Sequence, residues 1–446
     1  MSCWHYYDTP SADGDRVFSV ELSRVNFGHG ALEEVGMQAQ ALGLRRAALF
    51  TDRRVRKLPA MQRVCAALKQ AGVDFGIYDA VAIEPSDLSM LDAAAFVREG
   101  RFDGFISVGG GSVMDTCKAA SLYASYPAEF LTYVNAPIGM GVAVPGPLRP
   151  HIACPTTSGT GSECTGIAIC TLHAAGAEGL KTGLVSRLLR PTLALIDPAC
   201  TYTLPAEVVA ASGCDVLCHA LESYTARPYN QRQRAEHPEL RPMSQGANPY
   251  SDLGSLEALR LCGRYLLRAV KSAEDREARD GMMYAATLAG IAFGNAGVHL
   301  PHGMAYAVAS SVRDYRMPGY GDDPDAEPLV PHGLSVMLSA PAAFRFTAPA
   351  CAERHLEAAA ALGADIRGAD AAAAGTVLAD QLIELMQAAQ LPSGLREIGY
   401  RESDIPILCA GAQAQTRLLR NAPRLVDAAA LQSVFSDAMR YRTAHS

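Results

Sequence analysis

The stretch Gly104-Phe105-Ile106-Ser107-Val108-Gly109-Gly110-Gly111-Ser112 decides the fold of the first half of the chain. Its first five residues have the apolar character of a buried strand, and the glycine turn that follows (Gly109–Ser112) opens a helix. Glycines let a backbone approach a pyrophosphate closely, and the free N–H groups at a helix start attract negative charge. The glycine turn therefore favours phosphate binding. Its spacing is not GxGxxG, and a plain tight turn is the alternative.

Strand-like runs alternate with helical patterns around this stretch. Further strands are expected at 46–52, 73–78, 152–155, 166–171 and 192–196, with helices at 61–71 and 89–100. Such alternation indicates βαβ units and a parallel sheet. After Pro205 only helical patterns remain, at 208–225, 253–272, 276–292, 355–361 and 371–389. We therefore predict a dinucleotide-binding α/β domain at residues 1–204 and an all-helical, metal-binding domain at 205–446.

Two further polar groups follow predicted strands. Asp52 can accept hydrogen bonds from the ribose hydroxyls of NAD and would repel the 2′-phosphate of NADP, and a helix N-cap is the alternative. The loop Thr156-Thr157-Ser158-Gly159-Thr160-Gly161-Ser162-Glu163 offers hydroxyls for phosphate or ribose contacts, and an ordinary polar turn is the alternative. Because ligands bind at the carboxyl ends of parallel strands, this loop and the glycine turn support each other.

The helical half contains a candidate metal site. Asp215 and His219 are four residues apart in a predicted helix, which places them on one face, although a surface hydrogen bond is the alternative. Two Pro-His-Gly triplets place His302 and His332 in apolar sequence, where a lone histidine would be a satisfied core residue. One carboxylate with two or three imidazoles makes a mixed N/O site that can hold Fe²⁺ or Zn²⁺.

In this order, and over nearly the whole chain, these motifs resemble the iron-containing alcohol dehydrogenase family. The glycine turn with Asp115 and Lys118 belongs to that resemblance. It implies a Rossmann-like α/β domain followed by an all-α domain, the architecture shared with dehydroquinate synthase. It implies the metal ligands Asp215, His219, His302 and His332. It implies NAD contacts at Asp52, Gly109, Gly110, Gly111, Ser112, Asp115, Thr156, Thr157 and, as a match to a ribose-contacting lysine, Lys181.

Four stretches are similar to a subfamily that passes hydride between a hydroxyacid and an oxoacid: 135–139, 219–229, 294–299 and 328–335. This implies oxidation of a hydroxyacid such as 4-hydroxybutyrate, with a bound nicotinamide returning the hydride to 2-oxoglutarate. One alternative is an NAD-dependent alcohol dehydrogenase that releases NADH. A metal hydrolase would not need the glycine turn. A nucleotide-binding protein without catalysis would leave buried Asp and His side chains unpaired, at a cost in free energy.

The chain departs from the family pattern at two places. Many members carry a further histidine four residues after the third ligand, where this chain has Tyr306, which could still orient a substrate. The interval from His302 to His332 is longer than in simpler members, which makes His299 a rival ligand, although we expect it to pack. An acid substrate also needs a cation for its carboxylate. The candidates near the relevant loops are Arg227, Arg241 and Arg313, with solvated surface charges as the alternative.

Composition excludes several classes of protein. The 446 residues are 49% hydrophobic and carry a net charge of −7 without a basic stripe, which argues against a nucleic-acid partner. No window of 18 apolar residues predicts a membrane span. The N-terminal residues match neither a signal nor a transit peptide, and the 12 scattered cysteines are expected as reduced thiols. We therefore expect a cytoplasmic enzyme of small molecules, and a homodimer.

Overall fold

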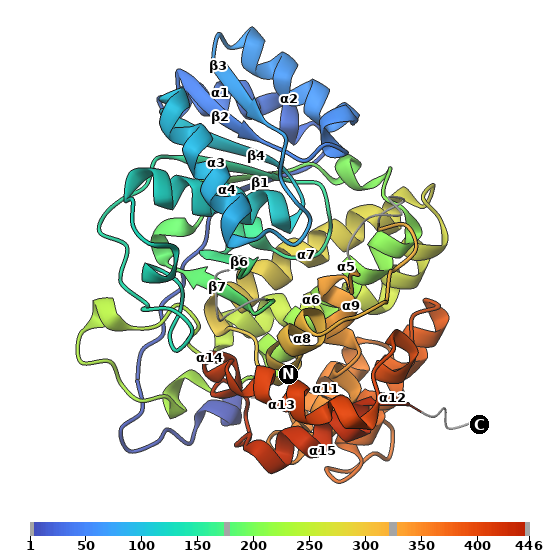
Figure 1. Ribbon diagram of the computed structural model, residues 1–446. Coiled ribbons are helices and arrows are strands. Elements are labelled where there is room, and N and C mark those ends of the chain that lie inside the picture. Colours follow the sequence, from blue (N-terminus) through green and yellow to red (C-terminus); the bar gives the residue numbers. More distant parts are fainter. Residues whose placement is uncertain (1–3, 174–178, 321–327, 442–446) are drawn as a thin grey trace. The chain divides into compact units, whose positions relative to one another are not determined.

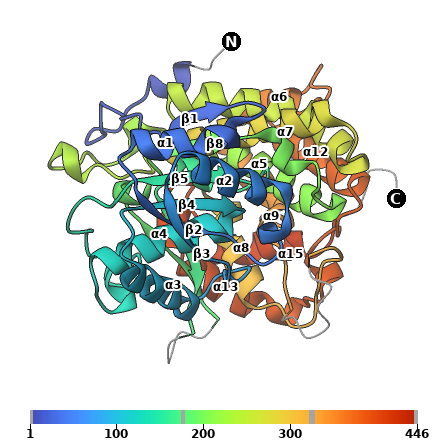
Figure 2. The ribbon, with the colours of Figure 1, turned by 90° about the horizontal axis from the view of Figure 1, so that it is seen from above.

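A six-stranded sheet organises residues 22–203, which we call the sheet unit. Its strands are β1 (Arg24–Phe27), β2 (Arg46–Phe50), β3 (Asp74–Tyr78), β4 (Gly104–Gly109), β5 (His151–Pro155) and β8 (Leu193–Ile196). They follow the order β1-β8-β5-β4-β2-β3, which Figure 2 shows from above, and every neighbouring pair is parallel. The strand expected at 166–171 differs. It forms β6 (Ile167–Thr171), which pairs antiparallel with β7 (Lys181–Val185) in a separate sheet because the two segments form a hairpin.

Helices cover both faces of this sheet. They are α1 (Val35–Ala41), α2 (Pro59–Gln70), α3 (Asp87–Gly100) and α4 (Gly111–Ser125). Successive side chains of a strand point to opposite faces. Ala47 and Leu49 of β2 pack with α1 and α2, whereas Ala48 and Phe50 pack with α3 and α4. Figure 1 shows these four helices around the strands of the sheet unit. The predicted α/β fold with a parallel sheet is confirmed.

The remainder of the chain, Met1–Glu21 with Leu204–Ser446, forms a second unit, which we call the helical unit. Its helices are α5 (Ala206–Thr225), α6 (Pro249–Lys271), α7 (Arg276–Ala296), α8 (Leu300–Ser310), α9 (His332–Met337), α10 (Ala340–Thr347), α11 (Ala352–Ala361), α12 (Ala374–Ala388), α13 (Ile405–Gln413), α14 (Thr416–Leu419) and α15 (Ala428–Ala438). The central helix is α5, which packs against α6, α7, α8, α9 and α11. Every residue of α5 from Gly213 to Thr225 is buried, so its polar side chains point into protein. The helical character predicted for this half is confirmed.

The first 21 residues belong to the helical unit, whereas the predicted boundary assigned them to the α/β domain. Polar side chains explain the difference. The carboxylate of Asp15 pairs with Arg241 at 2.7 Å. The side-chain amide of Gln245 accepts from the N–H of Ser19 at 2.7 Å and donates to its carbonyl at 2.9 Å. These partners lie in the long loop before α6, and no periodicity in the sequence announces them.

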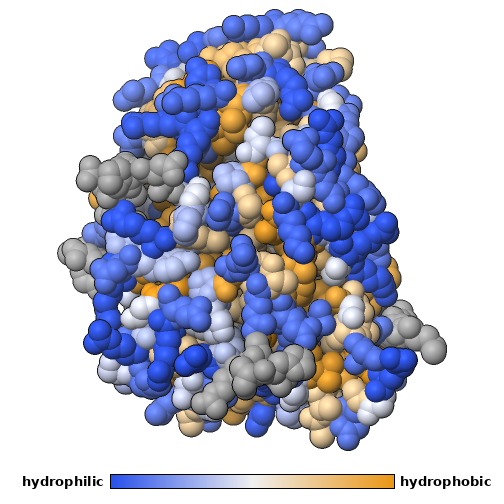
Figure 3. All heavy atoms as spheres, turned by 90° about the vertical axis from the view of Figure 1, so that its right-hand side faces the viewer, coloured by the Kyte–Doolittle hydropathy of each residue, from blue (hydrophilic) through white to orange (hydrophobic). Residues whose placement is uncertain are grey.

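The computed structural model describes residues 4–173, 179–320 and 328–441. Within those ranges no helix is long and apolar enough to cross a bilayer, and the cysteines are free thiols, buried except for Cys65 and Cys409. The face drawn in Figure 3 is largely hydrophilic, with hydrophobic residues showing in patches between the hydrophilic ones.

Candidate metal and cofactor sites

One carboxylate and three imidazoles meet inside the helical unit. Asp215 and His219 lie one turn apart on α5, His302 lies on α8, and His332 is the first residue of α9. The Oδ1 atom of Asp215 is 3.5 Å from Nε2 of His219, 3.5 Å from Nε2 of His302 and 3.8 Å from Nε2 of His332. Bonds of 2.0–2.2 Å to a four-coordinate cation hold neighbouring ligand atoms about 3.4 Å apart. The ligand atoms of Asp215, His302 and His332 all lie within 4.8 Å of one another and could share such a cation, and His219 is a further neighbour of Oδ1.

Glycine makes this convergence possible. A Cβ at Gly333 would lie 2.0 Å from the carbonyl oxygen of Ala211 and 2.8 Å from Cβ of Asp215. Only a residue without a side chain lets the start of α9 lie directly on α5. A Cβ at Gly303 would lie 2.9 Å from Cδ2 of Leu419, which is a milder conflict because that side chain can move. The glycine of each Pro-His-Gly triplet thus fixes the approach of its helix.

The charges of the cluster are arranged for a cation. Burial opposes ionisation of Asp215, but His219, His332 and His302 outweigh it and hold the pKa of Asp215 well below its usual range. Burial alone would lower the pKa of His302, but the carboxylates of Glu222 and Asp215 outweigh it and raise that pKa to about 9.

Oδ1 of Asp215 and Nε2 of His302 are buried without a hydrogen-bond partner among the described residues. Buried polar atoms are nearly always satisfied. A cation between the two atoms would satisfy both, so the residues present fit a divalent metal. The side chain of His332 is 21% exposed, against 2% for Asp215, so the cluster is most open to solvent at His332.

Glu222, which the sequence analysis did not single out, supports the cluster. Its Oε1 atom lies 2.6 Å from Nδ1 of His302, and its Oε2 atom accepts from the N–H of His299 at 2.6 Å. A carboxylate on the far nitrogen fixes the tautomer and orientation of a ligating imidazole. The spacing of residues 215, 219 and 222 on one helix face is the signal that could have identified it.

The structure also places His299, the rival metal ligand, and Tyr306, which stands where many family members have a histidine. Nε2 of His299 is 3.0 Å from the hydroxyl of Thr225, and its ring packs edge-on against Phe344. Burial lowers the pKa of His299 to about 4, which favours the neutral form. Tyr306 is 7% exposed, and its ring centroid lies 6.2 Å from that of His332. Tyr306 thus lies beside the open side of the cluster.

The predicted nucleotide-binding residues gather at one edge of the sheet unit. Asp52, the glycine turn and Thr156–Thr157 follow β2, β4 and β5, and β4 pairs with both other strands. A Cβ at Gly110 would lie 3.4 Å from the Thr157 side chain, and a Cβ at Gly111 would lie 2.7 Å from Thr160. The glycine turn and the threonine loop therefore touch. No side chain caps the start of α4, which leaves an N-terminus of the kind that binds phosphates.

Several of these residues also have protein partners. Oδ1 of Asp52 accepts from the N–H groups of Arg54 and Val55 at 2.8 and 2.9 Å, just before the 3-10 helix Val55–Lys57, whose N-cap position is Arg54. Asp115 accepts from the hydroxyl of Ser162 at 2.6 Å, and Lys181 forms an ion pair with Glu84. The cofactor contacts of these residues remain predictions.

Lys118 and Ser112 also bond within the sheet unit. The ammonium group of Lys118 donates to the carbonyl oxygens of Ser162 and Ile167. The hydroxyl of Ser112 accepts from the N–H of Glu84 at 3.3 Å. These contacts tie α4 and the glycine turn to the surrounding loops.

Comparisons with known proteins agree with both halves of the molecule. Residues 23–198 match the model of the iron-containing alcohol dehydrogenases, and residues 242–318 and 324–439 match the C-terminal model of the same family. The chain belongs to the iron-containing alcohol dehydrogenase family. As in its other members, the fold joins a parallel α/β unit to a helical unit, and the chain is an enzyme of that family.

Close relatives within the family are named hydroxyacid-oxoacid transhydrogenase, mitochondrial. The protein from Xenopus laevis is 49% identical over 428 residues, 96% of this chain and 91% of that protein. The protein from Mus musculus is 48% identical over 440 residues, 98% and 93% of the two chains. Among solved structures, a 1,3-propanediol oxidoreductase matches with a TM-score of 0.82 and 28% identity, covering 95% of this chain and 100% of its own.

The prediction of a cytoplasmic location is wrong by this comparison, because the relatives are named as mitochondrial proteins. That prediction rested on two observations: the N-terminal residues do not resemble a transit peptide, and the cysteines were expected to be reduced. Free thiols fit any compartment that keeps cysteines reduced, so they could not identify this one.

Proposed function

We propose that the protein is a hydroxyacid-oxoacid transhydrogenase. It would oxidise a hydroxyacid such as 4-hydroxybutyrate to succinate semialdehyde and reduce 2-oxoglutarate to 2-hydroxyglutarate, with a bound NAD carrying the hydride between them. Two hydrogens leave one substrate and enter the other, so no external oxidant is required. The observation that carries the proposal is identity of 48–49% to transhydrogenases over almost the whole chain.

The donor set supports the metal half of the proposal. Asp215, His219, His302 and His332 would hold a divalent cation, which supplies a Lewis acid that lowers the pKa of an alcohol. Glu222 keeps His302 oriented, and Tyr306 offers a hydroxyl beside His332 for positioning substrate. We assign Fe²⁺ on the family, although Zn²⁺ generally binds such a site more tightly.

The edge formed after β2, β4 and β5 supports the cofactor half. The glycine turn and the uncapped start of α4 would take the pyrophosphate of NAD, Thr156 and Thr157 would contact it beside the nicotinamide, and Asp52 would accept from the ribose. The nicotinamide supplies the hydride chemistry, while the protein positions and encloses the reactants.

A two-substrate assay tests the proposal. Metal-reconstituted protein receives 4-hydroxybutyrate and 2-oxoglutarate, with no NAD added. We expect succinate semialdehyde and 2-hydroxyglutarate in equal amounts over many turnovers. Product that forms only when free NAD is supplied, with NADH accumulating in solution, would contradict a retained cofactor and hence a transhydrogenase.

The second candidate is an NAD-dependent alcohol dehydrogenase that releases NADH. The structural likeness to 1,3-propanediol oxidoreductase favours it. Steady NADH production from NAD and 1,3-propanediol, with no effect of 2-oxoglutarate, would identify this activity.

We also propose a homodimer, which rests on the sequence expectation alone. Sedimentation at the monomer mass of 47.2 kDa would exclude it.

A further inference from the structure

Three arginines of the helical unit form a cationic cluster that the proposed mechanism does not use. Arg227 follows the end of α5, Arg232 lies in the loop beyond it, and Arg417 lies on α14. All three are partly exposed. We call them the arginine cluster.

The other two arginines suggested by the sequence are engaged elsewhere. Arg241 forms an ion pair with Asp15 at 2.7 Å, and Arg313 pairs with Asp404 at 2.5 Å. Because each already pairs with a carboxylate, Arg227 is the remaining candidate of the three for binding a substrate carboxylate.

In the part of the chain that the structure describes, no member of the arginine cluster forms an ion pair with a carboxylate. Arg227 donates to the carbonyl oxygen of Gln231, Arg232 to the carbonyl oxygen of Ser244 at 2.6 Å, and Arg417 to the Ser244 hydroxyl at 3.5 Å. A single arginine can be satisfied by carbonyl oxygens, as Arg279 is by Ala269 and Leu204. Three adjacent guanidinium groups also repel one another, and carbonyl oxygens do not cancel that repulsion.

The repulsion between these guanidinium groups contributes to a lowered pKa within the cluster. Burial, followed by the charges of Arg227 and Arg417, lowers the pKa of Arg232 to about 10. Burial also lowers the pKa of Arg417. Because arginine ordinarily stays charged, the cluster keeps its positive charge at neutral pH, and an anion bound there would relieve the repulsion.

A buried asparagine holds the cluster in place. Asn421 accepts the N–H of Arg227 through its carbonyl oxygen at 2.9 Å and Nη1 of Arg232 through its side chain at 2.9 Å. Its amide nitrogen donates to the carbonyl oxygens of Ala296 and Val298. Ala296 ends α7 and Val298 lies in the short link to α8, so the cluster is anchored to the segment that leads into the helix carrying His302.

Tyr306 links the cluster to the candidate metal site. Burial lowers the pKa of Arg417, and Tyr306 opposes that shift electrostatically; the ring centroid of Tyr306 lies 6.2 Å from that of His332. The helix that carries Arg417 also packs on α8, since Leu419 lies against Gly303. The order His332, Tyr306, Arg417 therefore runs from the metal ligands to the arginine cluster.

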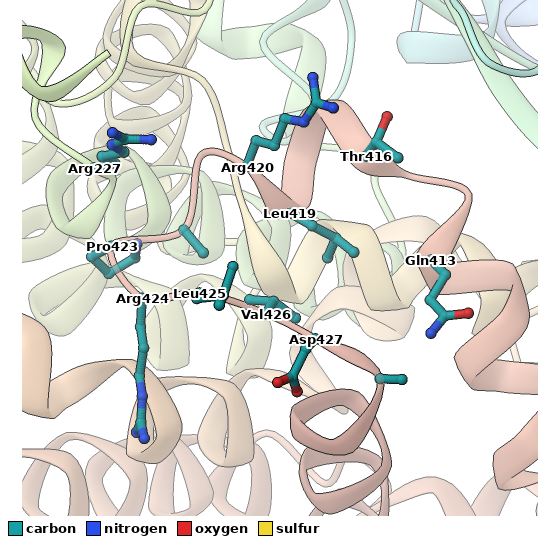
Figure 4. Close-up of a pocket in the computed structure, with 12 residues that line it drawn as sticks. Arg227, Gln413, Thr416, Leu419, Arg420, Pro423, Arg424, Leu425, Val426 and Asp427 are labelled. Atoms are coloured by element: carbon teal, nitrogen blue, oxygen red, sulfur yellow. The ribbon is translucent and has the colours of Figure 1, made fainter. Parts of the chain in front are cut away.

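The cluster borders a cavity at Arg227. This residue lines a cavity of about 480 Å³ between α14 and the start of α15, together with Arg420 and Arg424. In Figure 4 the guanidinium group of Arg424 is directed away from Arg227 and Arg420, and it donates to the carbonyl oxygen of Phe346. Asp427, the acidic residue of this cavity, caps α15 by accepting from Ala430.

We propose that Arg227, Arg232 and Arg417 bind the carboxylate of the acid substrate whose hydroxyl or oxo group reacts at the metal site. The inference rests on the proposed function and names the residues that make the enzyme specific for short hydroxyacids and oxoacids. Guanidinium groups bind carboxylates through paired, charge-assisted hydrogen bonds. A simple alcohol of the same length gains none of these bonds.

Binding of succinate to the metal-reconstituted full chain tests the proposal. Succinate carries two carboxylates but no group that can be oxidised or reduced as an alcohol or ketone, so its dissociation constant is measurable whatever reaction the enzyme catalyses. In Arg417→Leu and Arg232→Leu, we expect calorimetric titration to show affinity about 10- to 100-fold weaker. Arg417→Lys keeps the positive charge but loses the paired guanidinium donors, so its affinity for succinate should lie between that of the wild type and that of Arg417→Leu.

The matched control is Arg424→Leu, which removes the same charge from the same surface and should change the affinity less than twofold. Metal content and melting temperature of each variant are compared with the wild type to exclude misfolding. Unchanged succinate binding in both leucine variants would overturn the proposal. So would an equal loss in the control.

Transhydrogenation assays separate the two proposals. If the wild type binds succinate, the cluster variants lose it, and no transhydrogenation occurs, the arginine cluster stands and the proposed function fails. If transhydrogenation occurs and the cluster variants keep the wild-type KM for 2-oxoglutarate, the function stands and the cluster fails.

Discussion

Replacing Glu222 with glutamine exchanges one carboxylate oxygen for an NH₂ group and tests how the candidate metal site is held. In the wild type, both carboxylate oxygens accept: Oε1 from the His302 ring, and Oε2 from the N–H groups of His299 at 2.6 Å and His302 at 3.4 Å. Glutamine has one oxygen and one NH₂ group. Whichever way it turns, a donor faces either the ring N–H or the main-chain N–H groups, and the residue is fully buried.

Two routes give the size of the effect. Loss of a carboxylate partner behind a ligating imidazole weakens metal binding about 10- to 100-fold, which is about 1.4 to 2.7 kcal/mol. Independently, a hydrogen bond to a charged group contributes about 1.5 to 3 kcal/mol net. The two ranges overlap, so we expect Glu222→Gln to weaken metal binding by about 2 kcal/mol.

The assay is a competition between the protein and a chromophoric chelator for Zn²⁺ or Co²⁺, which avoids oxidation of Fe²⁺. The control is Glu277→Gln on α7, whose carboxylate is 56% exposed and pairs with Arg268. We expect its metal affinity to equal that of the wild type. Metal affinity of Glu222→Gln within twofold of the wild type would refute the view that Glu222 orients His302.

Three further perturbations follow from contacts described above. Gly333→Ala places a Cβ 2.0 Å from a carbonyl oxygen of α5. It should lower the free energy of unfolding, measured by denaturant titration, by about 1–3 kcal/mol and weaken metal binding. Wild-type metal affinity in this variant would contradict the role given to the glycine. In Gly110→Ala the new Cβ meets only the Thr157 side chain, at 3.4 Å, so the stability of the variant should equal that of the wild type. Its affinity for NAD should fall at least tenfold, which the NAD-induced rise in melting temperature measures. Burial, and then Lys118, lowers the pKa of His151 to about 3. Because this lies below the unfolded value of about 6.5, the unfolded chain binds the extra proton, and His151 contributes a fall in stability of about 1.4 kcal/mol per pH unit below pH 6.5, beside the contributions of the other buried histidines His299 and His355. His151→Asn should reduce the slope of stability against pH by about that amount between pH 6.5 and 5, and an unchanged slope would show that His151 does not contribute to it.

Local sequence patterns predicted the fold because its strands and helices carry their own signals. The run before the glycine turn forms β4, and the periodic runs in the helical half form α5, α6, α7, α11 and α12. Strand β1 was missed because its Arg, Val, Asn and Phe lack an apolar run, and pairing with β8 holds it in the sheet. The strand expected at 166–171 forms as β6, but its pairing with β7 in a separate sheet could not be predicted, because pairing partners are not visible in one strand.

The candidate site was predictable only where its residues repeat with a helical period or a motif. Asp215 and His219 have such spacing, and the Pro-His-Gly triplets indicate His302 and His332. Arg417 has no comparable signal, because its neighbours in space lie more than 100 residues earlier in the sequence. Long-range convergence of this kind depends on tertiary packing.

The pairing of the first 21 residues with the helical unit has a consequence for synthesis on the ribosome. Arg241, the partner of Asp15, is 226 residues later in the chain. At about 5–20 residues per second, roughly 11 to 45 s pass before that arginine is made. The sheet unit, residues 22–203, is complete within that time and can fold first, while the N-terminal segment with Tyr6 and Tyr7 waits unpaired. A tag or truncation at the N-terminus should therefore disturb the last part of the molecule to be synthesised and leave the unit next to it in the sequence intact.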